Sequence, residues 1–168
     1  MNITKIVEKS KKSGIYRKIL NIGLNRLVPF NKPHGFKVVE IGDHHLKIKV
    51  PYKKGNFNHI KGIHACALAT LSEFSTGFLL ITRLDPKKYR LIMQSIHMDY
   101  HYQAKMDAYG TFFISEEWLE KLIYQPLEST NKIIVDCEVK IHDKEGNHLS
   151  TGLVNWQIKS WKKVKTKV

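Results

Sequence analysis

The stretch Ile63-His-Ala-Cys-Ala-Leu-Ala-Thr-Leu-Ser-Glu-Phe-Ser-Thr-Gly-Phe-Leu-Leu80 decides the fold of this chain. It contains no Lys, Arg or Asp, and Glu73 is its only acidic residue. Apolar or small residues occupy nearly every side of its helical wheel, which predicts a helix that is buried on most of its faces. A buried carboxylate without a partner is costly and its pKa rises, so Glu73 requires either a partner or a chemical role.

Strand patterns lie on both sides of this helix in the sequence. Residues 46–50 alternate apolar side chains with Lys, so one face of that strand should meet water. Ser115 and the two acids that follow it predict a short helix to about Tyr124. Six segments are predicted strands: 36–41, 46–50, 91–102, 108–114, 133–142 and 149–161. Two strands, one helix and four strands with short connections predict an antiparallel α+β sheet folded around one central helix.

The segment before the first strand is basic and amphipathic. Residues 3–28 place apolar side chains at helical spacing with Lys and Arg between them, and Ser13-Gly14 and Gly23 interrupt the pattern. We expect one broken helix or two short ones, packed on the outside of the domain; a segment lying on a membrane surface is the alternative. The chain divides into a helical segment (1–33), a sheet-and-helix domain (34–161) and a basic tail (162–168).

The formal net charge of +13 is concentrated at the two ends of the chain. Residues 1–30 carry seven basic and one acidic side chain, residues 159–168 carry five Lys, and the body between them is only +2. Strong basicity is typical of proteins that bind nucleic acid, an anionic membrane or an anionic ligand. We expect no nucleic-acid partner, because no motif interleaves basic and aromatic residues, and we expect the basic ends to assist an anionic ligand or touch a membrane peripherally.

The cysteines and the apolar runs indicate the compartment. Cys66 and Cys137 form neither a C-x-x-C pair nor a zinc pattern, so we expect two buried thiols in a reducing compartment. No continuous apolar run reaches the roughly 18–20 residues that cross a bilayer. The first 18 residues have no apolar core of the secretory kind. We therefore expect a cytoplasmic protein.

The spacing of three polar residues resembles the motif of the PaaI-like acyl-CoA thioesterases. That motif has an Asn, a His-Gly-Gly six residues later, and an acid nine residues after the His. Asn58, His64 and Glu73 reproduce both intervals, while Ala65 and Cys66 replace the two glycines. The resemblance covers residues ~25–160 and extends to an uncharacterised branch with a helix before the first strand. It implies the hotdog fold, an antiparallel sheet wrapped around one long central helix, with an N-terminal helical extension.

The resemblance also implies roles for these residues. Glu73 would be the base or nucleophile, acting across a dimer interface, and the backbone N–H of Ala65 at the helix N-terminus would bind the oxyanion. Asn58 would orient substrate or water, His64 would hold the loop or contact the thioester, and Ser95 of the following strand would help to place water. Ala65 keeps the N–H but narrows the space for an acyl group. The structural alternative for Glu73 is a buried acid paired with Asn58 or a His.

Two further clusters have weaker patterns. Lys87, Lys88 and Arg90 fit either the phosphates of coenzyme A or a solvated loop. His97, Asp99 and His101 would share one strand face, where they fit either a metal or an exposed polar surface. We favour the polar surface and predict no metal site.

Three hypotheses for function follow from this sequence. The first is a homodimeric or dimer-of-dimers acyl-CoA thioesterase, for which a coenzyme A thioester is the substrate and no cofactor is required. The second is a hotdog protein that binds an acyl-CoA or fatty acyl ligand without hydrolysing it. The third, a nucleic-acid or membrane-associated domain driven by the basic ends, comes last.

Overall fold

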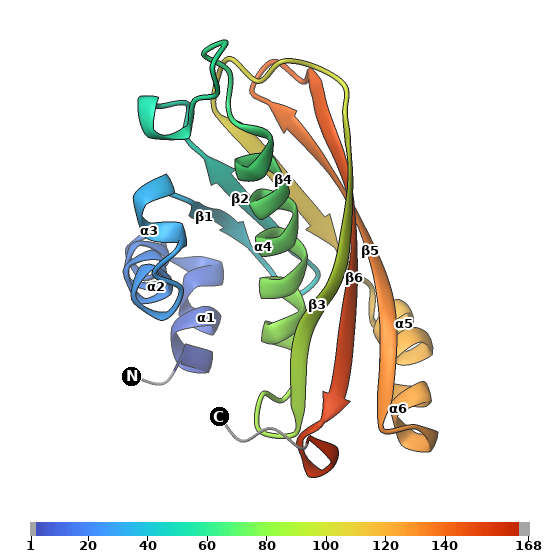
Figure 1. Ribbon diagram of the computed structural model, residues 1–168. Coiled ribbons are helices and arrows are strands. Elements are labelled where there is room, and N and C mark those ends of the chain that lie inside the picture. The colour runs from blue at the N-terminus through green and yellow to red at the C-terminus, as the bar shows by residue number, and fades with distance from the viewer. Residues whose placement is uncertain (1–2, 165–168) are drawn as a thin grey trace.

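Residues 3–164 are described by a computed structural model, in which one curved sheet surrounds a long helix (Figure 1). The strands are β1 (Lys37–Ile41), β2 (His45–Val50), β3 (Tyr89–Tyr100), β4 (Ala108–Phe113), β5 (Lys132–Asp143) and β6 (His148–Ser160). All neighbouring pairs are antiparallel, in the order β1-β2-β4-β5-β6-β3. The helix α4 (Ala65–Arg83) packs in the concavity of the sheet. The predicted α+β architecture is therefore confirmed. Residues 165–168 of the predicted basic tail lie outside the described residues.

Helix α4 approaches the sheet closely because glycines face small hydroxyl residues. A Cβ at Gly152 of β6 would lie 2.6 Å from Ser72 Oγ, and one at Gly110 of β4 would lie 2.7 Å from Ser75 Oγ. Both hydroxyls are buried and donate to carbonyls one turn earlier in the helix, so neither of these two hydroxyls is left unpaired. By length and hydropathy alone α4 could cross a membrane, but 61% of that window is buried inside the protein, as in a core helix.

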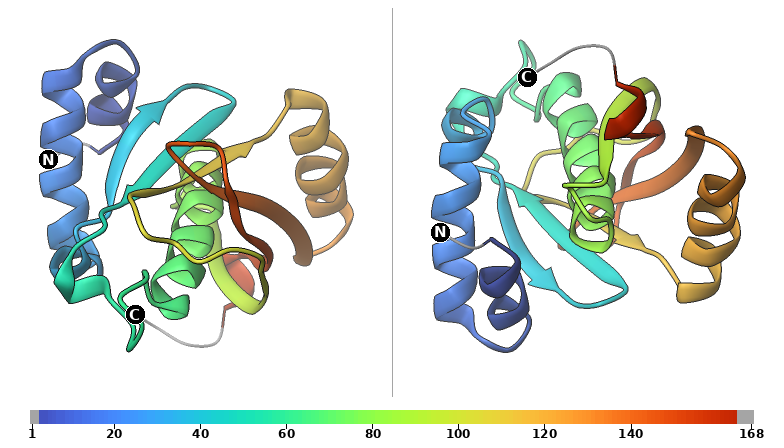
Figure 2. Two further views of the ribbon diagram at one scale, coloured as in Figure 1. Left: turned by 90° about the horizontal axis from the view of Figure 1, so that it is seen from above. Right: turned by 90° about the horizontal axis from the view of Figure 1, so that it is seen from below.

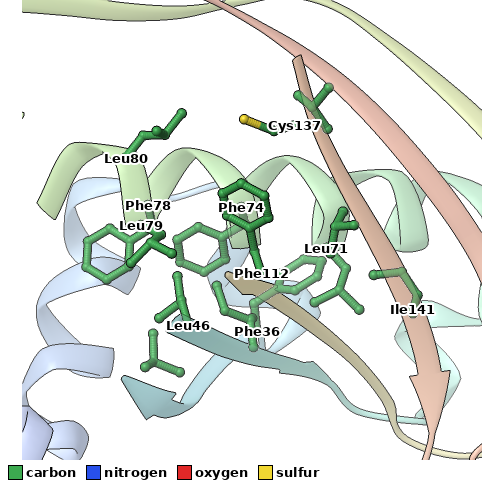
Figure 3. Close-up of a cluster of buried hydrophobic side chains, with 14 of the residues drawn as sticks. Phe36, Leu46, Leu71, Phe74, Phe78, Leu79, Leu80, Phe112, Cys137 and Ile141 are labelled. Atoms are coloured by element: carbon green, nitrogen blue, oxygen red, sulfur yellow. The ribbon is translucent and has the colours of Figure 1, made fainter. Parts of the chain in front are cut away.

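The hydrophobic core lies between α4 and the inner face of the sheet. Figure 3 shows aromatic and aliphatic side chains from both layers in contact there, among them Phe36, Leu46, Leu71, Phe74, Phe78, Phe112 and Ile141. Phe74 meets Phe36 edge to face, with ring centroids 6.3 Å apart, which joins the helix to the start of β1. The core fixes the rotation of α4 and therefore the direction in which Glu73 points.

The two cysteines differ in exposure. Cys137 of β5 is buried as expected, and burial raises the pKa of its thiol to about 12. The prediction that Cys66 is also buried was wrong, because it lies on the open side of the first turn of α4.

The N-terminal segment forms two helices, α1 (Ile3–Lys12) and α2 (Gly14–Leu27), and a short third one, α3 (Asn31–His34). The break falls at Ser13, as the sequence predicted, where the backbone is extended. The interruption predicted at Gly23 was wrong, because this glycine is buried inside a continuous α2. The side chain of Asn21 accepts from the N–H of Val38 at 2.8 Å and donates to its carbonyl at 3.0 Å. Helix α2 thereby satisfies the backbone of Val38 and covers the β1 edge of the sheet.

The connection between β4 and β5 is helical. It comprises α5 (Glu116–Leu119), a π-helical turn (Glu120–Tyr124) and α6 (Gln125–Ser129). Ser115 Oγ accepts from the N–H of Trp118 at 3.0 Å, which confirms the predicted helix start. The helical segment continues beyond Tyr124, because Pro126 stands in the first turn of α6, where a proline is tolerated.

Strand β3 contains a bulge that the alternating sequence pattern does not reveal. Its register against β6 shifts between Met93, opposite Trp156, and Ser95, opposite Asn155. Directly opposed residues share a face. Met93 therefore lies on the inner face of the sheet before the bulge, where it stays 39% exposed at the edge, and Ile96 lies on the inner face after it, while Ile92 lies on the outer face. The period-two sequence pattern of residues 91–102 predicts that Ile92 and Ile96 share one face, and the bulge makes that prediction wrong.

Candidate functional site

The first turn of α4 is capped by its own histidine. His64 is the N-cap residue. Its ring Nδ1 accepts a hydrogen bond from the backbone N–H of Cys66 at 3.1 Å, and its backbone N–H donates to the carbonyl of Asn56 at 2.8 Å. Because Nδ1 accepts, the neutral ring carries its proton on Nε2. The N–H of Ala65 has no partner among residues 3–164, as is usual for a first-turn amide. This N–H and the positive end of the helix suit a developing negative charge.

Asn56 holds the loop that leads into α4. Its side chain is 2% exposed; Nδ2 donates to the carbonyls of His34 (2.9 Å) and Pro51 (2.8 Å), and Oδ1 lies 3.1 Å from His34 Nδ1. These bonds join the end of α3, the end of β2 and the approach to His64. Sequence reasoning missed Asn56, because Gly55-Asn56 reads only as a turn that ends a strand.

We predict that Asn56→Ala lowers the free energy of unfolding by about 2–3 kcal/mol, since two buried carbonyls would lose their donor. Urea unfolding of the two proteins measures this loss. Asn25→Ala, on partly exposed α2 surface, is the matched control and should change the free energy by less than about 0.5 kcal/mol. Equal effects of the two substitutions would show that the Asn56 bonds do not organise the loop.

Asn58 shapes the same loop from within. Its Oδ1 accepts from the N–H groups of Ile60 (3.1 Å) and Gly62 (2.9 Å), and Lys61 between them has a positive φ of 60°. The Tyr52 hydroxyl donates to the carbonyl of Lys61 at 2.6 Å. The Asn58 side chain therefore has a structural role in this chain, and its role toward substrate or water stays a prediction.

Glu73 lies in the third turn of α4, half-buried and unpaired. Within the described part of the chain its carboxylate makes no hydrogen bond or ion pair, so the pairing with Asn58 or a His is not observed. Burial raises the pKa of this carboxyl. Glu73 follows Ala65 by eight residues, which places the two backbones about 12 Å apart along the helix. A glutamate side chain does not span that distance toward a carbonyl bound at Ala65.

A cavity of about 220 Å³ opens beside the first two turns of α4. Its walls include Phe30, Phe36, Phe57, His64, Cys66 and Thr70. Ligand pockets usually enclose roughly 300–1,000 Å³. One chain therefore offers an apolar recess next to the Ala65 amide, but less than a complete site for a large ligand.

The free edge of the sheet, β3, ends beside the first turn of α4. Within residues 3–164, strand β3 pairs only with β6, and along its open side Ile92 is 45% and Met93 39% exposed. The hydroxyl of Tyr100, at the end of β3, donates to the carbonyl of Ala65 at 3.1 Å and ties the edge to the start of α4. A long apolar edge is a template for another strand. Because α2 covers β1, β3 is the edge that remains available.

Ser95 lies away from these groups. Its hydroxyl donates to Oδ1 of Asn155 at 2.5 Å, and Asn155 in turn donates to Asp136 on the outer face of the sheet. Glu73 lies on the inner side, so the predicted placement of water by Ser95 has no support in this geometry. The part that Ser95 takes in placing water stays a prediction.

Lys87, Lys88 and Arg90 lie at the C-terminal end of α4. The 19-residue helix is about 28 Å long, so within one chain these cations are remote from Ala65. Lys88 pairs with Asp85 at 3.9 Å, and Arg90 donates to Gln157 at 3.3 Å. The Nε of Arg90 is buried and has no partner in the part of the chain that the structure describes. Contact of the three with coenzyme A phosphates stays a prediction.

His97 and Asp99 lie on the outer face of β3, and His101 follows the end of the strand. His97 Nε2 is 3.3 Å from Asp99, whereas the His101 ring lies against the ring of His148, tilted by 44° with centroids 4.4 Å apart. The three predicted candidates therefore do not converge. No group of three possible ligands forms within residues 3–164.

A curved antiparallel sheet around one long helix is the hotdog fold. More narrowly, the chain belongs to the family of the domain of unknown function DUF4442, whose model matches residues 16–161. No curated protein matches the chain.

Solved structures share this fold at low sequence identity. A protein of unknown function from Pseudomonas aeruginosa, described as a probable thioesterase, is 22% identical, covering 85% of this chain and 95% of its own, with a TM-score of 0.77. A Staphylococcus aureus thioesterase mutant is 13% identical (79% and 99% covered, TM-score 0.63). A Haemophilus influenzae thioesterase is 9% identical (87% and 94%, TM-score 0.67). These likenesses confirm the fold predicted from the sequence.

Proposed function

We propose that this protein hydrolyses acyl-CoA-type thioesters at sites shared between two chains. Glu73 is the base or nucleophile, and the Ala65 N–H binds the oxyanion. The observation that carries the proposal is the unpaired, half-buried Glu73, whose backbone lies about 12 Å from that of Ala65 along α4. Both groups must approach one carbonyl, so each site combines Glu73 of one chain with Ala65 of another.

A homodimer formed by β3 edges supports this combination. Antiparallel pairing of β3 with its own copy places the Tyr89 end of one strand beside the Tyr100 end of the other. Tyr100 contacts Ala65, so the Lys87–Arg90 loop of one chain approaches the N-terminus of α4 of the other. That loop supplies cations for the phosphates of coenzyme A. The mass of the protein in solution distinguishes a single dimer from a dimer of dimers.

The chemistry at such a site is simple in outline. The Ala65 amide and the helix N-terminus polarise the thioester carbonyl, and ionised Glu73 takes a proton from the attacking water. The tetrahedral intermediate then expels the thiolate, which receives that proton, and leaves a carboxylic acid. Attack by Glu73 itself gives the same products through an anhydride that water cleaves. Its raised pKa makes Glu73 a stronger base than an exposed glutamate.

Binding without hydrolysis is the second candidate. It is favoured by Ala65 and Cys66, which stand at the two glycine positions of the motif, and by the modest 220 Å³ recess beside them. Added side-chain atoms at these positions reduce the room for a reacting acyl group. The likeness to structures described as thioesterases favours the enzyme.

A panel of acyl-CoA substrates tests the proposal. Purified full-length protein is mixed with short, long and aromatic acyl-CoAs, and release of free thiol is followed colorimetrically. We expect at least one substrate to be hydrolysed at about 1 s⁻¹ or faster. Tight binding of an acyl-CoA by calorimetry with no thiol release across the panel would select the binding protein instead.

A further inference from the structure

Helix α2 presents an apolar row to the outside of the molecule. The exposed fractions are 72% for Ile15, 57% for Ile22, 64% for Leu27 and 62% for Phe30, and Ile19 between them is also exposed. Positions 15, 19 and 22 follow helical spacing and share one face. Figure 2 shows α2 along one side of the molecule, with α5 and α6 on the opposite side.

Helix α2 differs from a usual surface helix, because it carries apolar residues on its outer side as well as on its inner side. The inner side of α2 is already apolar, since Leu20 and Leu24 are buried in the core. A surface helix normally carries polar residues on its other side. The sequence pattern predicted a helix packed on the domain, and it did not show that apolar residues remain on the outer side as well. We call the set of Ile15, Ile19 and Ile22 on this face, with the exposed Leu27 at the end of α2 and Phe30 just beyond it, the α2 row.

Exposed cations surround the α2 row without any acid among them. Lys18 and Arg26 lie on the outer side of α2, three and four residues from Ile15 and Ile22, and Lys12 and Lys32 lie near its two ends. No Asp or Glu occurs between Glu8 and Glu40. An apolar row bordered by Lys and Arg is the composition of helices that lie in the interface of an anionic membrane.

We propose that the α2 row docks this protein on the surface of an anionic lipid membrane. The apolar side chains enter the region between headgroups and acyl chains, and Lys12, Lys18, Arg26 and Lys32 meet the lipid phosphates. A second copy of the chain is a poorer occupant. In a two-fold interface the same patch meets itself, so the cations of both copies would be brought together without an acid between them.

Docking here places the lipid surface beside the candidate site. Phe30 belongs both to the α2 row and to the wall of the 220 Å³ recess, which also contains His64 and Cys66. An acyl chain leaving the membrane at Phe30 is therefore next to the first turn of α4. This consequence rests on the proposed function, whereas the docking itself does not require hydrolysis.

Vesicle sedimentation with the full chain tests the proposal. The vesicles are phosphatidylcholine alone or phosphatidylcholine mixed with phosphatidylglycerol. We expect binding to the anionic vesicles to be at least about tenfold tighter and to weaken as salt is added. Ile15→Ser/Ile22→Ser removes apolar contact and Lys18→Glu/Arg26→Glu reverses charge; each should weaken binding by about tenfold or more. Phe113→Ser/Lys140→Glu, an exposed pair on the sheet, is the matched control and should bind like wild type.

Three results would overturn the proposal. They are no binding to anionic vesicles at low salt, unchanged binding by both α2 variants, and a halved solution mass of Ile15→Ser/Ile22→Ser without lipid. The last result would show that the α2 row covers a second copy. All these residues are exposed, so circular dichroism should confirm that each variant folds. Hydrolysis of soluble acyl-CoA is measured separately, so failure of the enzyme proposal leaves the vesicle result interpretable.

Discussion

Glu73→Gln is expected to lower thioester hydrolysis by about 10²- to 10⁴-fold, and at neutral pH the variant should melt at a higher temperature than wild type. The amide keeps the shape of the side chain but neither accepts a proton from water nor attacks a carbonyl. It also removes a charge that is half-buried without a partner. Loss of activity together with gain of stability distinguishes a functional acid from a structural one, whose replacement would destabilise the fold.

The gain in stability should depend on pH in a definite direction. Burial raises the pKa of Glu73 above the value of 4.5 that it has when unfolded. Between these two pKa values the folded state binds a proton that the unfolded state does not, so the free energy of unfolding falls as pH rises. The loss of stability caused by ionised Glu73 is complete above the folded-state pKa and absent below 4.5. The melting temperatures of the two proteins should therefore differ at neutral pH and converge in acid.

Thermal melting across this pH range, with Glu117→Gln as the matched control, checks the expectation. Glu117 is exposed in α5, so its substitution should change neither hydrolysis nor the pH dependence. Full activity of Glu73→Gln would remove the carboxylate from the mechanism. A lower melting temperature at every pH would show that Glu73 has a stabilising partner.

The sequence predicted the parts of the fold that depend on local patterns. The apolar run in which Glu73 is the only charged residue identified the central helix, found as Ala65–Arg83. A helix that is buried on most of its faces must be built almost entirely from apolar and small residues. Segments with period-two alternation identified six strands, because successive side chains of a strand point to opposite faces of the sheet. The resemblance to the thioesterase motif, and not a local pattern, implied that Ala65 lies at the helix N-terminus, where α4 begins.

Other features depend on contacts that local patterns do not encode. The bulge near Gln94 inserts one residue into β3, and apolar residues on both sides of the strand hide the shift. Asn56 is important through partners 5 and 22 residues away, which no spacing rule links to it. The orientation of α2 is a third case. Its sequence has apolar residues on two faces, and either face could pack on the core. In the structure Leu20 and Leu24 are buried, which leaves the face with Ile15 and Ile22 exposed.

Disruption of the β3 edge is expected to produce a monomer that has lost about 10²-fold in hydrolysis, since each chain then lacks half of every site. Wild type should have a solution mass of twice 19.5 kDa, about 39 kDa, or a multiple of it. Ile92→Lys/Met93→Lys places two cations on the open edge, where pairing with a copy would bring like charges together. Light scattering coupled to size exclusion measures the mass. Phe113→Lys, on a position 69% exposed in β4, should remain a dimer with full activity.

Mixing two inactive chains tests whether the site is shared. Ala65→Pro removes the proposed oxyanion donor, and proline suits this first helical position, because the preceding His64 is extended (ψ 140°). If sites are shared, a dimer of one Ala65→Pro chain and one Glu73→Gln chain has one site with both lesions and one intact site. Random mixing makes half of the dimers mixed, so about a quarter of wild-type hydrolysis should return. Sites contained within single chains would recover nothing, because every site in the mixture would lack either the Ala65 N–H or the Glu73 carboxylate.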